Sequence, residues 1–142
     1  MAINVYLNFN GNCREAVEFY AEVFGTEQPL IMTYGQAPPD PNFALPDEAE
    51  NLVLHAKLNI TGSTVMFSDN FPGSDYVVGT NVSLSVTSKD IDEIKSLFDK
   101  MKVGGNVFME LHETFWSKCY GNLTDKFGIE WQFSYDNGEM GM

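Results

Sequence analysis

The stretch Ile3-Asn-Val-Tyr-Leu-Asn-Phe9 alternates strictly between apolar and polar side chains. Alternation with a period of two is typical of a β-strand that is buried on one face only. The pattern returns at Asn81-Val-Ser-Leu-Ser-Val86, where Val82, Leu84 and Val86 share one face. Each stretch is followed by apolar residues at helical spacing, which predicts two strand–helix units.

The ends of the two helices also have sequence signals. Asn12 is the expected cap of the first helix, with Glu15 three residues on as in a capping box, and Gly25 is the expected stop. Thr87 or Ser88 is the expected cap of the second helix. The apolar positions at helical spacing are Ala16, Val17, Tyr20, Val23 and Phe24 in the first helix, and Ile91, Ile94, Leu97, Phe98 and Met101 in the second.

The remaining sequence predicts more strands and one long loop. Residues 36–51 contain four prolines and are expected to form a loop. We expect a first module over residues 1–70, a linker over 71–79 and a second module over 80–142, within one compact domain overall. Further strands are predicted at residues 28–34, 52–60, 64–67 and 129–135.

A single shift of the chain along itself, from Asn4 to Asn81, relates the two modules. It places the polar residues of the first strand over those of the second, and the two helices over each other. The same shift carries His55 onto Gln132. The alternative is that any two alternating strands can be superposed in this way. We interpret the pattern as an internal repeat, which predicts an α+β fold built from two copies of one β-α-β unit.

The polar faces of the repeated strands are the candidate site. Their apolar faces must pack on helices, so the opposite faces are either solvated or close around a pocket. Trp116 could stack on a flat ligand, although large aromatic side chains more often lie in cores or interfaces. The residues expected to line the cleft are Asn4, Tyr6, Asn8, His55, Lys57, Asn81, Ser83, Trp116, Glu130 and Gln132.

The composition excludes several partners. With 20 acidic against 8 basic residues, the formal net charge is −12. Such a chain repels nucleic-acid backbones and anionic membrane surfaces. Because no apolar run approaches membrane-spanning length and the N-terminus enters a strand at once, we expect a cytoplasmic protein. Cys13 and Cys119 lack the spacing of a metal or redox pair and are expected to be reduced and structural.

Four parts of the chain carry a family resemblance. They are Tyr6-Leu-Asn-Phe-Asn-Gly-Asn-Cys-Arg-Glu-Ala-Val-Glu-Phe-Tyr20, His55-Ala-Lys-Leu-Asn-Ile60, Met66-Phe-Ser-Asp69, and Trp116-Ser-Lys-Cys-Tyr-Gly121 with Asp125, Gly128 and Trp131. With these stretches the chain resembles the PhnB-like branch of the vicinal oxygen chelate superfamily, which includes glyoxalase I, bleomycin-resistance proteins and extradiol dioxygenases. The resemblance implies paired βαβββ modules around a cleft, and a homodimer. Such proteins are often called methyltransferases, but the sequence has no strand-to-helix Gly-x-Gly turn of the kind that holds a nucleotide-like cofactor.

The resemblance also implies where a metal would bind. Metal-dependent members place one ligand on each of four strands, and the matching positions here are Asn4, His55, Asn81 and Gln132. Only His55 is a strong ligand, and the four supply no negative charge, so we expect no tightly held metal and no other cofactor. Glu130 could complete a site if the strand register slips.

Three functions remain open at this point. The first is a metal-free protein that binds a small molecule in the cleft. The second is a lyase or dioxygenase that uses a divalent metal, or uses His55 as an acid–base group. The third is a structural dimer that makes contact through residues 36–51. His55 is the best catalytic candidate, and the alternative for it is a histidine that orders its strand through a hydrogen bond.

Overall fold

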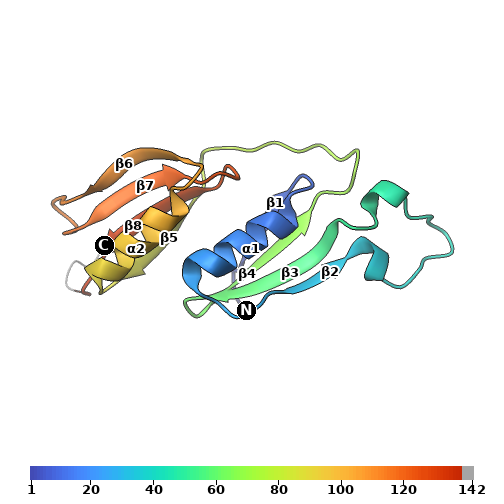
Figure 1. Ribbon diagram of the computed structural model, residues 1–142, viewed down its shortest axis with the longest axis horizontal. Helices are drawn as coiled ribbons and strands as arrows, with labels where there is room; N and C mark the ends of the chain where they lie inside the picture. Colours follow the sequence, from blue (N-terminus) through green and yellow to red (C-terminus); the bar gives the residue numbers. More distant parts are fainter. Residues whose placement is uncertain (139–142) are drawn as a thin grey trace. The chain divides into compact units, whose positions relative to one another are not determined.

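The structure is a computed structural model that describes residues 1–138. The chain divides into two compact units, Met1–Val77 and a second unit that begins at Val78. Each unit contains one α-helix and a four-stranded sheet (Figure 1). The predicted α+β fold of two tandem βαβββ modules is therefore confirmed.

The first unit forms a mixed sheet in the order β1-β4-β3-β2. β1 pairs parallel with β4, while β3 pairs antiparallel with both β4 and β2. Two short 3-10 helices, η1 (Tyr34–Gln36) and η2 (Asp47–Ala49), lie in the segment that leads from β2 to β3. The longer elements are β1 (Val5–Phe9), α1 (Cys13–Phe24), β2 (Leu30–Thr33), β3 (Val53–Ile60) and β4 (Ser63–Asp69).

The second unit repeats this topology. Its sheet has the order β5-β8-β7-β6, with β5 parallel to β8 and the other pairs antiparallel. Its elements are β5 (Ser83–Ser88), α2 (Ile91–Met101), β6 (Asn106–His112), β7 (Tyr120–Thr124) and β8 (Glu130–Tyr135).

Each helix covers one face of its own sheet, as Figure 1 shows. In the first unit the buried Tyr20 ring of α1 stacks on Phe67 of β4, with 5.9 Å between ring centroids. In the second unit the Phe98 ring of α2 meets Phe133 of β8 edge-on at 5.6 Å. Since side chains alternate across a strand, the residues between these core positions point away from the helices.

The sheet orders correct one part of the predicted repeat. The shift from Asn4 to Asn81 relates β1 to β5 and α1 to α2. It fails further along the chain, because β3 has β7 and not β8 as its counterpart in sheet order. Phe67 on β4 pairs with Ala56, and Trp131, at the corresponding position of β8, pairs with Leu123. The residues that precede Ala56 and Leu123, which are His55 and Asn122, therefore correspond to each other in register. The predicted match of His55 with Gln132 is therefore wrong.

Two of the predicted helix caps are also wrong. Asn12 occupies the cap position of α1, but its side chain makes no capping hydrogen bond. Instead, Oδ1 of Asp69 accepts hydrogen bonds from the backbone amides of Gly11 (2.8 Å) and Cys13 (3.0 Å). α2 is capped by Asp90, which accepts from the amides of two following residues, and not by Thr87 or Ser88.

The C-terminal cap of α1 follows the prediction. Gly25 has φ +63°, a left-handed conformation that favours glycine, and ends the helix as expected.

Both cysteines are free thiols in buried positions, as expected from their spacing. Burial, together with the nearby Asp69 carboxylate, raises the pKa of Cys13 to about 12. Burial likewise raises the pKa of Cys119. Because a thiol attacks as the thiolate, neither cysteine is a candidate nucleophile at neutral pH.

Residues 1–138 contain no helix that is long and apolar enough to cross a membrane.

Candidate functional site

The polar face of the first sheet brings together two of the predicted site residues. Tyr6 on β1 and His55 on β3 meet across the face, with the Tyr6 hydroxyl 3.4 Å from Nδ1 of His55. Their rings are 5.9 Å apart between centroids and tilted by 46°. His55 also stands opposite Met32 on the edge strand β2. The pair has the chemistry of a weak acid–base couple, and no carboxylate hydrogen bond to His55 is found among the described residues.

Other predicted residues on this face have structural partners or lie at its edge. Asn8 accepts a hydrogen bond from Ser68 on β4 through its Oδ1 (3.1 Å). Lys57 is exposed and lines a shallow hollow of about 470 Å³ beside the end of α1 and β2. This hollow is wide and lined mainly by exposed residues such as Glu27 and Gln28, so it offers few fixed groups to a ligand.

Asn4 and Asn81 lie outside the strands on which they were predicted. Asn4 precedes β1 and Asn81 precedes β5, and both are exposed. The alternating sequence pattern extends further toward the N-terminus than the hydrogen-bonded ladders do. The first ladder begins at Val5 and the second at Ser83.

The polar face of the second sheet holds a connected hydrogen-bond network. Nε2 of Gln132 donates to Oγ of Ser83 (2.7 Å), and the Tyr120 hydroxyl donates to Oε1 of Gln132 (3.1 Å). Nδ2 of Asn122 donates in turn to the Tyr120 hydroxyl (3.4 Å). The network therefore crosses β5, β8 and β7 and fixes the orientation of both amide side chains.

A hollow of about 160 Å³ lies over this network. Three predicted site residues, Ser83, Glu130 and Gln132, line it together. Oε1 of Glu130 accepts a hydrogen bond from the Thr124 hydroxyl (2.9 Å), which positions the carboxylate. The other lining residues are Thr80, Phe108, Tyr120, Asn122 and Trp131.

Asn122 is one of the residues of this site that the sequence analysis missed. Its Oδ1 atom is buried and has no hydrogen-bond partner. Buried polar atoms are nearly always paired, so an unpaired acceptor calls for an explanation such as a ligand. The polar positions Tyr120, Asn122 and Thr124 alternate with Gly121 and Leu123, and this pattern could have identified the face of β7.

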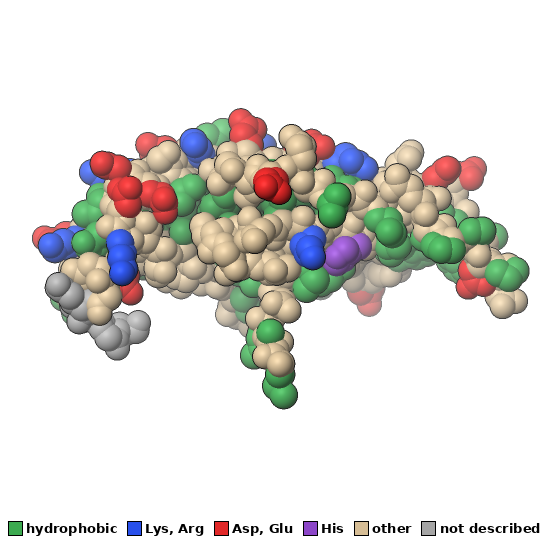
Figure 2. Space-filling model, turned by 90° about the horizontal axis from the view of Figure 1, so that it is seen from below, with side chains coloured by type: hydrophobic (Ala, Val, Ile, Leu, Met, Phe, Trp, Pro, Cys, Tyr) green, Lys and Arg blue, Asp and Glu red, His purple; other side chains and the backbone are tan. Residues whose placement is uncertain are grey.

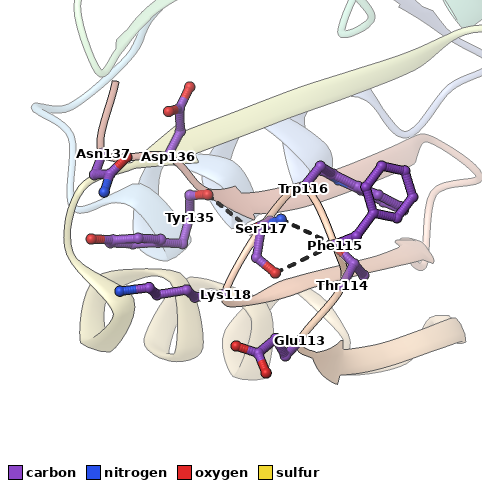
Figure 3. A pocket seen from close by; sticks show the side chains of 9 residues that line it. All are labelled: Glu113, Thr114, Phe115, Trp116, Ser117, Lys118, Tyr135, Asp136 and Asn137. Carbon is purple, nitrogen blue, oxygen red and sulfur yellow. Dashed lines mark hydrogen bonds between the residues drawn. The ribbon is translucent and has the colours of Figure 1, made fainter. Parts of the chain in front are cut away.

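Trp116 lies in a separate hollow of about 220 Å³, formed by the loop between β6 and β7 and the end of β8 (Figure 3). The exposed Phe115 ring meets the Trp116 ring edge-on, with 4.8 Å between centroids. The buried Ser117 hydroxyl donates to the backbone carbonyl of Tyr135 (2.8 Å), which ties the loop to the strand. The hydrogen-bonding groups of the loop therefore form hydrogen bonds within the loop and to β8. Trp116 thus lines a different hollow from the predicted residues on the sheet face, although its ring meets Tyr120 of the network edge-on, with 5.3 Å between centroids.

The residues proposed for a metal site do not fit a tightly bound divalent ion. The four residues, Asn4, His55, Asn81 and Gln132, supply one imidazole and three neutral amides. Both the oxygen and the nitrogen of the Gln132 amide are already hydrogen-bonded. Among residues 1–138, no three side chains of His, Cys, Asp and Glu are grouped so that they could share an ion.

Acidic side chains dominate the charge of the chain, which has a formal net charge of −12. On the face seen in Figure 2, acidic groups are scattered among lysine and arginine, and no continuous basic patch forms there. An anionic ligand would therefore approach this protein against a repulsive field.

Two tandem βαβββ units of this topology give the chain the vicinal oxygen chelate fold. The fosfomycin resistance protein FosX from Listeria monocytogenes shares the fold, with a TM-score of 0.65 over 100% of this chain and 98% of that chain. At 12% identity this likeness concerns the fold alone.

The chain belongs to the PhnB-like family, since the family profile described as 3-demethylubiquinone-9 3-methyltransferase matches residues 1–134. It is 32% identical to protein YjdN of Escherichia coli, over 94% of this chain and 95% of that one. Among solved structures, PA1353 from Pseudomonas aeruginosa has a TM-score of 0.84 at 32% identity, covering 96% and 98% of the two chains.

The same family relationship appears in a second solved structure. A protein from Bacillus cereus, described as a putative 3-demethylubiquinone-9 3-methyltransferase and PhnB protein, has a TM-score of 0.76 at 29% identity, covering 96% and 100% of the two chains. The family and fold inferred from the sequence are thus confirmed.

Proposed function

We propose that this protein binds a small molecule in the hollow on the polar face of its second sheet, without a tightly held metal ion. The observation that carries the proposal is the buried Oδ1 atom of Asn122, which lacks a partner at the end of an otherwise connected network. Leaving such an atom unpaired costs about 1–3 kcal/mol. A ligand N–H or O–H group that bonds to Asn122 would remove that cost.

The proposal also includes the location and the oligomeric state of the protein. These are the cytoplasmic location expected from the sequence and the homodimer implied by the family resemblance. The methyltransferase activity in the family description is not part of it. The strand-to-helix turn between β1 and α1 contains the single glycine Gly11, and that between β5 and α2 contains none. Neither turn offers a glycine-rich cradle for a nucleotide-like cofactor.

We expect a library of small polar fragments, screened by NMR on the full chain, to shift the side-chain amide of Asn122. Asn122→Ala should weaken the binding of every such fragment by about tenfold, because one hydrogen bond to a buried acceptor is lost. Asn59→Ala removes an exposed amide on β3 and serves as the matched control. Fragments that bind Asn122→Ala as tightly as the wild type would contradict the proposal.

A lyase or dioxygenase-type enzyme, which uses either a divalent metal or His55 as an acid–base group, is the second candidate, and the Tyr6 hydroxyl at Nδ1 of His55 favours its acid–base form. Metal analysis by mass spectrometry, with Ni²⁺, Zn²⁺, Mn²⁺ and Fe²⁺ offered in turn, separates the metal-dependent form from the first candidate. We expect no stoichiometric metal in the wild type and no change in thermal stability on adding any of these ions. A stoichiometric ion that is lost in His55→Ala would overturn our proposal in favour of metal-dependent chemistry.

A further inference from the structure

A bulge in β6 brings an aromatic ring to the hollow. Val107 pairs with Leu123 and Met109 pairs with Asn122, so Phe108 is an extra residue in the ladder. A bulge of this kind sets two consecutive residues against one on the neighbouring strand. Phe108 and Met109 therefore both oppose Asn122, and Phe108 lines the hollow.

The Phe108 side chain is 81% exposed although it is large and apolar. Covering such a ring removes apolar surface from water, which stabilises a protein or a complex. Bulges are over-represented at sheet edges, where β6 lies, and beside active sites, where they change the direction of a side chain. An exposed ring set there by a bulge, next to an unpaired buried acceptor, indicates a flat ligand that covers the ring and reaches the acceptor.

The charge of the hollow determines which flat ligands suit it. Of the described residues that line it, Glu130 is the one charged side chain, and none is lysine or arginine. One carboxylate oxygen accepts from Thr124, which leaves the other available to a ligand. The site thus presents a carboxylate to N–H donors and holds the unpaired, buried oxygen of Asn122 beside it, and it lacks a positive charge for an anion.

The size of the hollow limits the ligand further. Pockets that hold drug-sized ligands measure roughly 300–1,000 Å³. The hollow here measures about 160 Å³, which suits a single ring with one polar substituent.

We propose that the ligand is a single flat aromatic ring with a cationic or N–H-rich substituent. Its ring stacks on Phe108, and its N–H groups donate to Oδ1 of Asn122 and to the Glu130 carboxylate. This inference rests on the proposed function and names the ligand class for the same hollow. Ring stacking stabilises such a complex beyond the effect of the apolar area that it buries.

Benzamidine and benzoate are suitable probes, because they share a ring and a planar substituent and differ in charge. We expect benzamidine to shift the NMR signals of Asn122 and Glu130 in the full-length protein, and benzoate to leave them unchanged. Phe108→Ala should weaken benzamidine binding by about 5- to 10-fold. Glu130→Gln should weaken it by a similar factor, since the charge is lost but the shape is kept.

Phe115→Ala is the matched control, because Phe115 is equally exposed at 84% but lines the separate hollow by Trp116. It should bind benzamidine as the wild type does. Binding of benzoate as tight as that of benzamidine, or unchanged binding in Phe108→Ala, would overturn the inference. If benzamidine does not bind while other fragments still shift Asn122, the ligand class is wrong and the proposed function stands. If no fragment shifts Asn122, both fail.

Discussion

Replacing Asp69 with alanine is expected to lower the free energy of unfolding of the first unit by about 3–5 kcal/mol. Asp69 is 3% exposed and ends β4. Oδ1 accepts from the amides of Gly11 and Cys13, and Oδ2 accepts from the amide of Val53 (2.9 Å). One side chain therefore fixes the start of α1 and the start of β3, and its removal leaves backbone donors without partners.

The measurement must report on the first unit. Both tryptophans, Trp116 and Trp131, lie in the second unit, so their fluorescence is the wrong probe. Urea unfolding should instead be followed by circular dichroism, and local opening by hydrogen exchange of the α1 amides. We expect Asp69→Ala to accelerate exchange throughout α1.

Asp75→Ala is the control for Asp69→Ala, because Asp75 is an exposed carboxylate in the same unit. Its effect should stay within about 0.5 kcal/mol. Asp69→Asn keeps one acceptor oxygen and should lose less stability than Asp69→Ala. An Asp69→Ala protein as stable as Asp75→Ala would show that the three hydrogen bonds carry no net stability.

The elements of this fold could be predicted from local patterns. Alternation identified β1, β5 and β8, and helical spacing identified α1 and α2, because one face of each element packs in the core. Thr61 and Gly62 form the turn between β3 and β4. Both residues adopt positive φ, as a two-residue hairpin connection requires.

Contacts between distant parts of the chain could not be predicted in this way. The capping box at Asn12 is a sound local pattern, but the amides of Gly11 and Cys13 bond to Asp69, more than fifty residues further on. A capping Asn12 side chain would accept from the amide of Arg14 or Glu15, whereas Asp69 accepts from the amides on either side of Asn12, so a distant residue fixes the start of α1. Sequence proximity gave no indication of this pairing.

The grouping of the candidate site residues also depends on distant contacts. Ser83, Glu130 and Gln132, which the sequence predicts to line a cleft, lie on a polar sheet face and line one hollow. Asn122 and Phe108 were missed, because their roles depend on how β6 and β7 pair. A repeat found by one fixed shift cannot identify Asn122 as the counterpart of His55, since the two units differ in loop length after their second strands.

Replacing Asp125 with alanine is the corresponding prediction for the second unit, with an expected loss of about 3 kcal/mol. Asp125 is 3% exposed and lies between β7 and β8. Its Oδ1 accepts from the amides of Phe127 (2.8 Å) and Ile129 (3.1 Å), and its Oδ2 accepts from Nε1 of Trp131 (2.8 Å). The carboxylate holds the turn that leads into β8.

Tryptophan fluorescence is the right probe for this variant, because the indole of Trp131 loses its hydrogen-bond acceptor. We expect Asp125→Ala to lower the urea midpoint and to change the emission of the folded protein. Trp131→Phe removes one of the three hydrogen-bond donors to Asp125 and keeps the other two. Its free energy of unfolding should therefore fall by less than that of Asp125→Ala, at about 1–2 kcal/mol. Asp99→Ala removes the surface ion pair between Asp99 on α2 and Lys102. It should lower the free energy of unfolding by at most about 0.5 kcal/mol.

The position of Asp125 links this stability effect to the site. Glu130 and Gln132, which line the hollow, follow the turn directly on β8. If the carboxylate sets the register of β8, Asp125→Ala should also disturb the NMR signal of the Gln132 side chain, even at low temperature where the protein stays folded. An undisturbed Gln132 signal together with a lowered urea midpoint would separate the two roles and leave Asp125 with stability alone.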